Sequence, residues 1–203
     1  MTSLNFEQAK QYAMTLLERE LDPHLIYHSL AHTRDDVVAA VERLAELEGV
    51  QGEALTLLLT AAWYHDLGYV EQTASHEMVS ARIAGQMLPG FGFSGAQIDL
   101  VQATILATSM PQSPLSHLEQ ILVDADLDSL GRTDFMLLNQ ILRLEFAYLG
   151  KEYSDPVWYA DQIRFLENHR YYTQSASRLR DPQKLVNLKE LENRFFESAH
   201  SSI

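Results

Sequence analysis

A histidine and an aspartate stand side by side at the end of an apolar run, in the segment TAAWYHDLGYV. The apolar residues before them recur at helical spacing, so His65 and Asp66 border the buried face of a predicted helix. Burying an imidazole beside a carboxylate is costly unless another group compensates both, and a divalent cation would do so. The pair therefore predicts a metal site, although a lone His-Asp dipeptide also fits an ordinary helix end near Gly68.

An upstream segment, YHSLAHTRDDV, holds two more histidines that are four residues apart. Ser29 is suited to cap a helix there, so His32 is expected in the first turn and His28 just before it. Without the His-Asp pair, two exposed histidines at a helix start would be an equally good interpretation. Imidazoles and carboxylates together accept many divalent metals. The prediction is thus a divalent metal ion, namely manganese, iron, nickel, cobalt, magnesium or zinc, whose identity the residues do not indicate.

The next candidate ligand is an aspartate of LVDADLDSL, which offers Asp124, Asp126 and Asp128. On a helical projection Asp126 falls nearer the apolar stripe than Asp124 does. Asp124 is then predicted to orient an imidazole or a water, and Asp128 to be solvated. An acidic helix end is the alternative interpretation in a chain with 28 acidic residues. The predicted metal ligands are two imidazoles and two carboxylates: His32, His65, Asp66 and Asp126.

The order YHSLAH, HD and ADLDSLG resembles the HD-domain superfamily of metal-dependent phosphohydrolases, whose ligands are one histidine, a vicinal His-Asp pair and a distal aspartate. The first segment also resembles the YHNxxHxxDV motif of cyclic nucleotide phosphodiesterases. That resemblance implies that His28 is a general acid and His32 a metal ligand. A closer resemblance, to a bacterial branch of the superfamily, spans about residues 24–195 through HEMVSARIA, ILATSMPQ, DADLDSLG, RLEF and FLENHRYY.

The chain departs from these patterns at three places. Ser29 replaces an asparagine, His76 stands where the branch commonly has asparagine, and the histidine expected after ILAT is missing. A second metal would have only His76, Glu77 and Asp124 as nearby ligands, so one metal is favoured. Arg143, in RLEF, is the first choice for a cation that holds the phosphate, with His76 and Asp124 as further candidates for substrate binding.

The resemblance implies hydrolysis of a phosphate ester of a small molecule, a nucleotide or another phosphomonoester, by metal-activated water. Asp66 would be both a ligand and the base for that water, and His28 would protonate the leaving group. The departures motivate one alternative, a catalytically degenerate HD protein that binds a nucleotide or metal as a sensor or scaffold. A second alternative is an all-helical interaction protein in which the histidines and aspartates are coincidental.

Composition and pattern predict an all-α fold. With 203 residues, 46% of them hydrophobic, and no break in composition, the chain is expected to form a single domain over residues 1–203, and the resemblance implies that this domain is of the HD type. Nine helices are expected as a bundle, over about residues 5–20, 29–48, 52–67, 76–88, 95–109, 117–130, 133–150, 156–170 and 182–198. Asp181-Pro182 predicts the break before the last of them.

Charge and hydrophobic pattern also limit the partners. A net charge of -13 argues against nucleic acid and against an anionic membrane surface as partners. The chain has no cysteine, no apolar signal core and no apolar run long enough to span a bilayer, which predicts a cytoplasmic protein. A small phosphorylated substrate is the expected partner, and nothing in the sequence indicates an oligomeric state.

Overall fold

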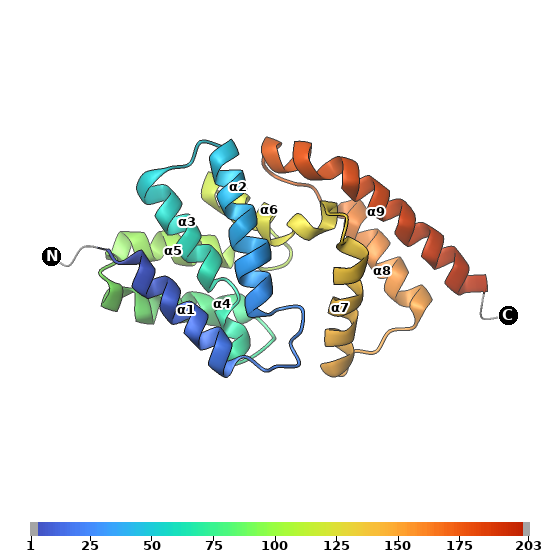
Figure 1. Ribbon diagram of the computed structural model, residues 1–203, viewed down its shortest axis with the longest axis horizontal. Coiled ribbons are helices and arrows are strands. Elements are labelled where there is room, and N and C mark those ends of the chain that lie inside the picture. The colour runs from blue at the N-terminus through green and yellow to red at the C-terminus, as the bar shows by residue number, and fades with distance from the viewer. Residues whose placement is uncertain (1–3, 201–203) are drawn as a thin grey trace. The chain divides into compact units, whose positions relative to one another are not determined.

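The computed structural model describes residues 4–200, and all regular secondary structure in this range is helical (Figure 1). Nine α-helices, three 3-10 helices and one π-helical segment occur there, without a β-strand, so the prediction of an all-α fold with about nine helices is confirmed. The chain divides into two compact units between Asp126 and Leu127. This division neither confirms nor contradicts the single domain predicted over residues 1–203, whose ends, 1–3 and 201–203, lie outside the described residues.

The first unit contains six α-helices joined by short helical segments. In chain order these elements are α1 (Phe6–Glu20), the π-helical η1 (His32–Val38), α2 (Ala39–Leu47), α3 (Gly52–Tyr64), η2 (Leu67–Val70), α4 (His76–Met87), η3 (Leu88–Phe91), α5 (Gly95–Leu106) and α6 (His117–Asp126). Side-chain caps begin some of them: Asn5 accepts a hydrogen bond from the backbone of Gln8, and Ser94 forms a capping box with Gln97.

Helix α3 is the central helix of this unit. Its sequence, GEALTLLLTAAWY, is apolar on nearly all sides, as is typical of a helix surrounded by others, and it packs against α1, α2, α4, α5 and α6. Every side chain from Thr60 to Tyr64 is buried, and the hydroxyl of Tyr64 donates to the carbonyl of Ala9 at 3.0 Å. This packing fixes the C-terminal end of α3, and with it His65 and Asp66, which follow directly.

The helix that carries His32 begins with an unusual turn. As predicted, the hydroxyl of Ser29 caps this helix, because it accepts a hydrogen bond from the backbone N–H of His32 at 3.3 Å. The following residues, 32–38, are π-helical before the chain continues as α2. Short π-helical turns are rare in proteins, and those that do occur are often found at functional sites. His28 lies in the irregular segment before the helix, also as predicted.

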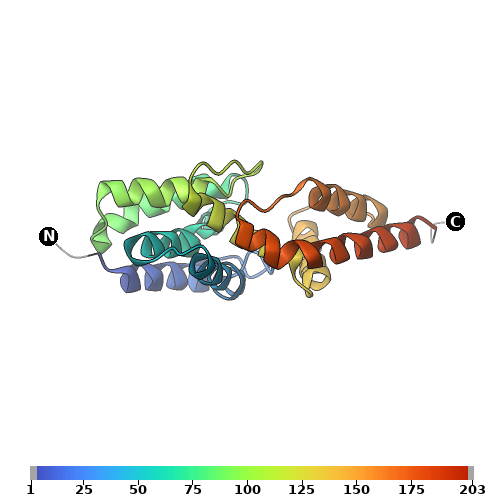
Figure 2. The same ribbon diagram turned by 90° about the horizontal axis from the view of Figure 1, so that it is seen from above.

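The second unit contains η4 (Asp128–Gly131), α7 (Phe135–Tyr148), α8 (Asp155–Asn168) and α9 (Gln174–His200). Helix α9 packs along α8 (Figure 2). The core of this unit is aromatic and aliphatic: Leu130, Phe135, Trp158, Tyr159, Leu166 and Leu191. The indole of Trp158 is buried and donates to the side-chain carbonyl of Asn139 at 2.8 Å, which satisfies its polar atom.

Helix α9 is longer than the sequence predicts. Asp181-Pro182 predicted a break, but the helix begins at Gln174 and continues through Pro182, so that prediction was wrong. A proline inside a helix removes one backbone hydrogen bond and usually bends the axis, and α9 changes direction in its first half (Figure 1). Among residues 4–200, neither this helix of 27 residues nor any other combines the length and apolar character that spanning a membrane requires.

Asp128 is buried, contrary to the prediction that it is solvated. Both of its carboxylate oxygens accept hydrogen bonds from Arg180 of α9, each at 2.7 Å. A Cβ atom on Gly131 would overlap with the backbone of Arg180, so only glycine permits this approach. The side chain of Asn187 donates to the carbonyl of Leu130 at 2.9 Å. The DSLG segment is therefore held against α9, which gives Asp128 a structural role.

His169 follows α8 and is buried beside Lys184 of α9. The ammonium group of Lys184 donates to the carbonyl of His169 at 2.7 Å and lies 3.1 Å from its Nδ1. The imidazole also contacts the ring of Tyr171 edge-on, with centroids 4.5 Å apart. Burial, followed by the positive charge of Lys184, lowers the pKa of His169 to about 4.

We expect His169 to make the second unit sensitive to acid. Histidine in the unfolded chain takes up a proton near pH 6.5, but in the folded chain only near pH 4, so unfolding is favoured as the pH falls through this window. The contribution of the neutral His169 imidazole to the free energy of unfolding is fully present above pH 6.5, and about 3 kcal/mol of it is lost by pH 4. His169→Gln should flatten this dependence in urea unfolding followed by tryptophan fluorescence, whereas His200→Gln, at an exposed site, should not. An unchanged pH dependence in His169→Gln would contradict the expectation.

Candidate metal centre

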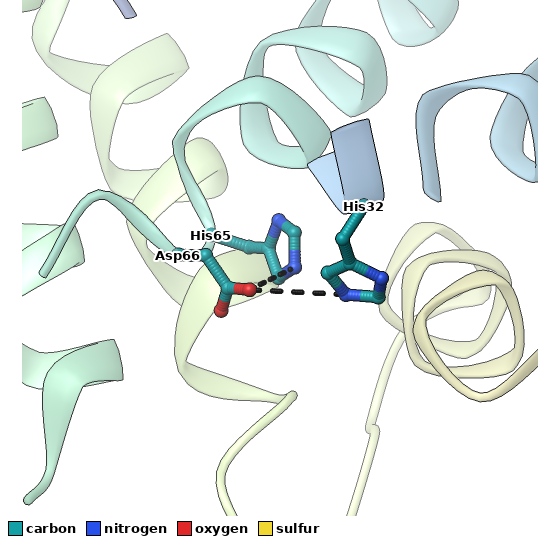
Figure 3. A group of neighbouring side chains, drawn as sticks. All are labelled: His32, His65 and Asp66. Atoms are coloured by element: carbon teal, nitrogen blue, oxygen red, sulfur yellow. Dashed lines mark ion pairs between the residues drawn. The ribbon is translucent and has the colours of Figure 1, made fainter. Parts of the chain in front are cut away.

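Two histidines and an aspartate converge in the first unit (Figure 3). His32 begins η1, and His65 and Asp66 lie between α3 and η2. One potential ligand atom from each lies within 4.8 Å of the others. The exposed fractions of His32, His65 and Asp66 are only 6%, 1% and 4%, so these polar groups are removed from water. This buried group could hold a metal ion.

Asp126, the last residue of α6, brings a second carboxylate to the group. Its Oδ1 lies 3.6 Å from Nε2 of His32 and 3.4 Å from Nε2 of His65. Oδ2 of Asp66 lies 3.8 Å and 3.2 Å from the same two nitrogens (Figure 3). Around a tetrahedral metal with bonds of about 2.1 Å, neighbouring ligand atoms are about 3.4 Å apart. The four distances are close to this spacing. The group whose ligand atoms all lie near one another comprises His32, His65 and Asp66, and Asp126 as a fourth ligand stays a prediction.

The imidazoles are turned so that their Nε2 atoms face the carboxylates. Nδ1 of His65 donates to the carbonyl of Ala62 at 2.8 Å, and Nδ1 of His32 lies 3.6 Å from Oδ2 of Asp36. Metal-binding histidines usually place their second ring nitrogen against a carbonyl or carboxylate in this way. Nε2 of His65 and Oδ2 of Asp66 are buried without a hydrogen-bond partner in the described part of the chain. A cation between them would satisfy both atoms.

The electrostatics of the group also favour a positive charge. Burial opposes protonation of His32, but the nearby carboxylates of Asp126 and Asp36, each 3.6 Å from a ring nitrogen, prevail and raise its pKa to about 9. The pKa of His65 is likewise raised, because the carboxylates of Asp66 and Asp126 outweigh burial. Helices α3 and α6 both end at this group, and helix C-termini carry partial negative charge. A divalent cation would take the place of these protons.

Asp124 is more buried than Asp126, although the sequence placed Asp126 nearer the apolar stripe. Asp124 is fully buried, whereas the side chain of Asp126 is 20% exposed. The helical projection ranked them wrongly because α6 packs against α2, α3, α5 and η1, and is therefore covered on more than one side. The position of Oδ1 of Asp126 beside both Nε2 atoms, and not its burial, makes it the candidate ligand.

Two matched variants separate these aspartates. Asp126→Asn should lose most of the bound metal, because its Oδ1 is the atom that faces both imidazoles. Asp124→Asn should retain the metal, with an affinity at most about tenfold lower, as is typical of a residue that acts through a ligand. Elemental analysis after dialysis, with circular dichroism to confirm folding, measures the difference. A larger loss in Asp124→Asn would identify that residue as the ligand.

Three half-buried rings border the group. The imidazole of His28 stacks on Tyr69, with centroids 4.3 Å apart, and His76 stacks on the same ring at 4.0 Å. Nε2 of His76 lies 3.2 Å from Oδ1 of Asp66, so this residue, predicted to contact substrate, lies beside the candidate metal ligands. Sequence reasoning missed Tyr69. The signal that could have found it is its position in HDLGY, one short turn after Asp66.

Arg143, predicted to hold the phosphate, lies in the second unit. It forms an ion pair with Asp155 at 2.7 Å and donates to the carbonyl of Tyr153 at 2.6 Å. Its guanidinium also lies 6.0 Å from the centre of the Trp158 ring, within the range of a cation–π contact. These contacts give Arg143 a structural role within its unit, and a role in substrate binding stays a prediction.

In comparisons with known proteins, no family model matches the chain, and no curated protein or solved structure matches it. The resemblance to the HD-domain superfamily therefore rests on the motifs alone. The site must be interpreted from its own residues and their geometry.

Proposed function

We propose that the chain is a metal-dependent phosphohydrolase of the HD-domain type, which cleaves a phosphate ester of a small molecule such as a nucleotide or another phosphomonoester. The observation that carries this proposal is a buried group in which two imidazole nitrogens each lie within 4 Å of two carboxylate oxygens. A bound divalent cation would lower the pKa of water to about 7 and neutralise charge on a phosphoryl oxygen. Ester hydrolysis requires both effects.

The residues around the group suit the proton transfers of this reaction. Oδ2 of Asp66 faces the two Nε2 atoms, while its Oδ1 faces His76, so the carboxylate has one oxygen beyond those assigned to the metal. That oxygen can accept the proton of the attacking water. The ring of His28 lies near the group, with its centroid 6.1 Å from that of His32, and it stacks on Tyr69. It is therefore our candidate for the acid that protonates the leaving group.

The burial of the group supports a small substrate. The side chains of His32, His65 and Asp66 are almost completely removed from solvent, so a terminal phosphate could approach more readily than the backbone of a folded nucleic acid. The net charge of -13 acts in the same direction, because it disfavours long polyanions. We therefore place nucleotides and other small phosphoesters before nucleic acids as substrates.

One observation favours a second candidate, a degenerate HD protein that binds a metal or nucleotide without turnover. The hydroxyl of Ser29, which replaces an asparagine of the resembled motif, caps the backbone N–H of His32. A side chain used in this way does not supply the amide group that asparagine would place next to His28. If that amide were essential for His28 to act as the proton donor, the chain would bind its ligand but not cleave it.

The decisive experiment is a screen of phosphate esters after removal of metal by a chelator. Manganese, magnesium, iron, nickel, cobalt and zinc are supplied separately with nucleoside monophosphates, cyclic nucleotides, sugar phosphates and p-nitrophenyl phosphate. We expect at least one combination of metal and ester to release phosphate. This release should stop when the metal is chelated and return when the metal is added back. His65→Ala controls for a contaminating phosphatase. Metal binding without any turnover would support the degenerate protein, and no metal binding would support the interaction protein.

A further inference from the structure

The ring of Tyr69 is shared by two imidazoles at the edge of the candidate metal centre. Its plane is inclined by 21° to that of His28 and by 28° to that of His76, which is close to parallel stacking in both cases. The two imidazoles are also near each other, with centroids 6.2 Å apart. One tyrosine therefore contacts both the proposed acid and the partner of Asp66.

The backbone holds Tyr69 firmly in this place. Its N–H donates to the carbonyl of Asp66 at 3.1 Å, which ties it to the candidate metal ligand. The N–H of Gly68 donates to the hydroxyl of Ser80 in α4 at 2.8 Å. A Cβ atom on Gly68 would overlap with the backbone of His76, so glycine alone allows η2 to approach the start of α4 this closely. The backbone that carries the ring is thus fixed relative to both Asp66 and α4.

We propose that Tyr69 is a positioning residue whose ring sets the orientation of His28 and His76. This inference rests on the proposed function, since it assigns Tyr69 to the same proton transfers. A half-buried imidazole can rotate about its side-chain torsions, and the energy typical of aromatic stacking corresponds to a roughly three- to tenfold preference for the stacked orientation. The ring thereby keeps His28 available to the leaving group and Nε2 of His76 against Oδ1 of Asp66.

The stacking requires the ring and not the hydroxyl, which gives a test by conservative rescue. Tyr69→Leu should lower kcat for phenyl phosphate roughly tenfold, with metal content and KM unchanged. The loss should be smaller for p-nitrophenyl phosphate, whose leaving group needs little protonation. Tyr69→Phe should restore both rates, and Tyr172→Leu, at an exposed tyrosine of the second unit, is the matched control. Equal losses for both esters, or a failure of Tyr69→Phe to restore them, would overturn the proposal.

A double-mutant comparison tests whether Tyr69 acts through His28. In the background of His28→Ala, Tyr69→Leu should cause a smaller further loss of turnover of phenyl phosphate than it does in the wild type, because one of the two imidazoles that the ring positions is already absent and only His76 remains. Losses that multiply would show that the two side chains act independently and would overturn this part of the inference.

A readout that needs no turnover separates this inference from the proposed function. In the zinc-loaded chain labelled with 13C-histidine, the imidazole protons of His28 and His76 should carry ring-current shifts that Tyr69→Leu removes and Tyr69→Phe preserves. His28→Gln and His76→Gln assign the two signals. Shifts that do not depend on Tyr69 would overturn the inference whatever the activity. Shifts that do depend on it, in a wild-type chain that cleaves no ester, would support the positioning of the imidazoles and overturn the proposed function.

Discussion

His65→Ala and Asp66→Ala should each abolish tight binding of a divalent metal while leaving most of the helical structure intact. Each substitution removes a buried atom, Nε2 or Oδ2, that has no hydrogen-bond partner in the described part of the chain. Loss of the metal should also remove the stabilisation that a bound metal gives to the folded state, about 2.7 kcal/mol when the metal is present at about a hundred times its dissociation constant. Elemental analysis, far-UV circular dichroism and unfolding with and without metal measure these effects.

His117→Ala is the matched control for this experiment. His117 belongs to the same unit but is exposed, and its ion-pair partner is Glu48, at 3.5 Å. We expect this variant to keep the metal content and the metal-dependent stability of the wild type. Wild-type metal content in both His65→Ala and Asp66→Ala would show that the buried group does not bind the ion.

His28→Ala should retain the metal but lose roughly 10²–10⁴-fold in turnover of an ester with a poor leaving group, the usual contribution of a positioned proton donor. p-Nitrophenyl phosphate should be affected much less, because its leaving group needs little protonation. Steady-state kinetics with both esters and metal analysis of the same samples measure the effect. His24→Ala, at an exposed histidine of the same irregular segment, should leave both rates unchanged.

The two outcomes that contradict this prediction differ in meaning. If both esters lost rate equally with the metal retained, His28 would orient the substrate and would not be the acid. If the metal were lost, His28 would be a ligand, and the stacking of its ring on Tyr69 would have to change when the ion binds.

Local sequence patterns predicted most of the helices and the residues His32, His65 and Asp66 that lie together. Apolar periodicity placed α3, and the run that makes α3 the central helix also brings His65 and Asp66 into the core. The cap at Ser29 correctly placed His32 inside its helix and His28 before it. These features depend on neighbours along the chain, which is why the sequence alone could indicate them.

Features that depend on distant residues were not predictable in the same way. Asp124 is more buried than Asp126 because several helices surround α6, which a projection of one helix cannot show. Pro182 lies inside α9 although a proline usually marks a break, since packing along α8 and the bond from Arg180 to Asp128 stabilise the helix there. In each case tertiary contacts outweighed a local rule.

The π-helical turn that begins with His32 has a consequence for how this part of the chain can vary in length. A π-helical turn holds one residue more than an α-helical turn. Deleting one residue between His32 and Val38 would restore regular winding and rotate the residues on its two sides by about 100° relative to each other. Either the apolar face of α2 would then leave the core, or His32 would turn away from Asp66. The extra residue allows one continuous helix to keep two registers, one set by hydrophobic packing and one by the histidine.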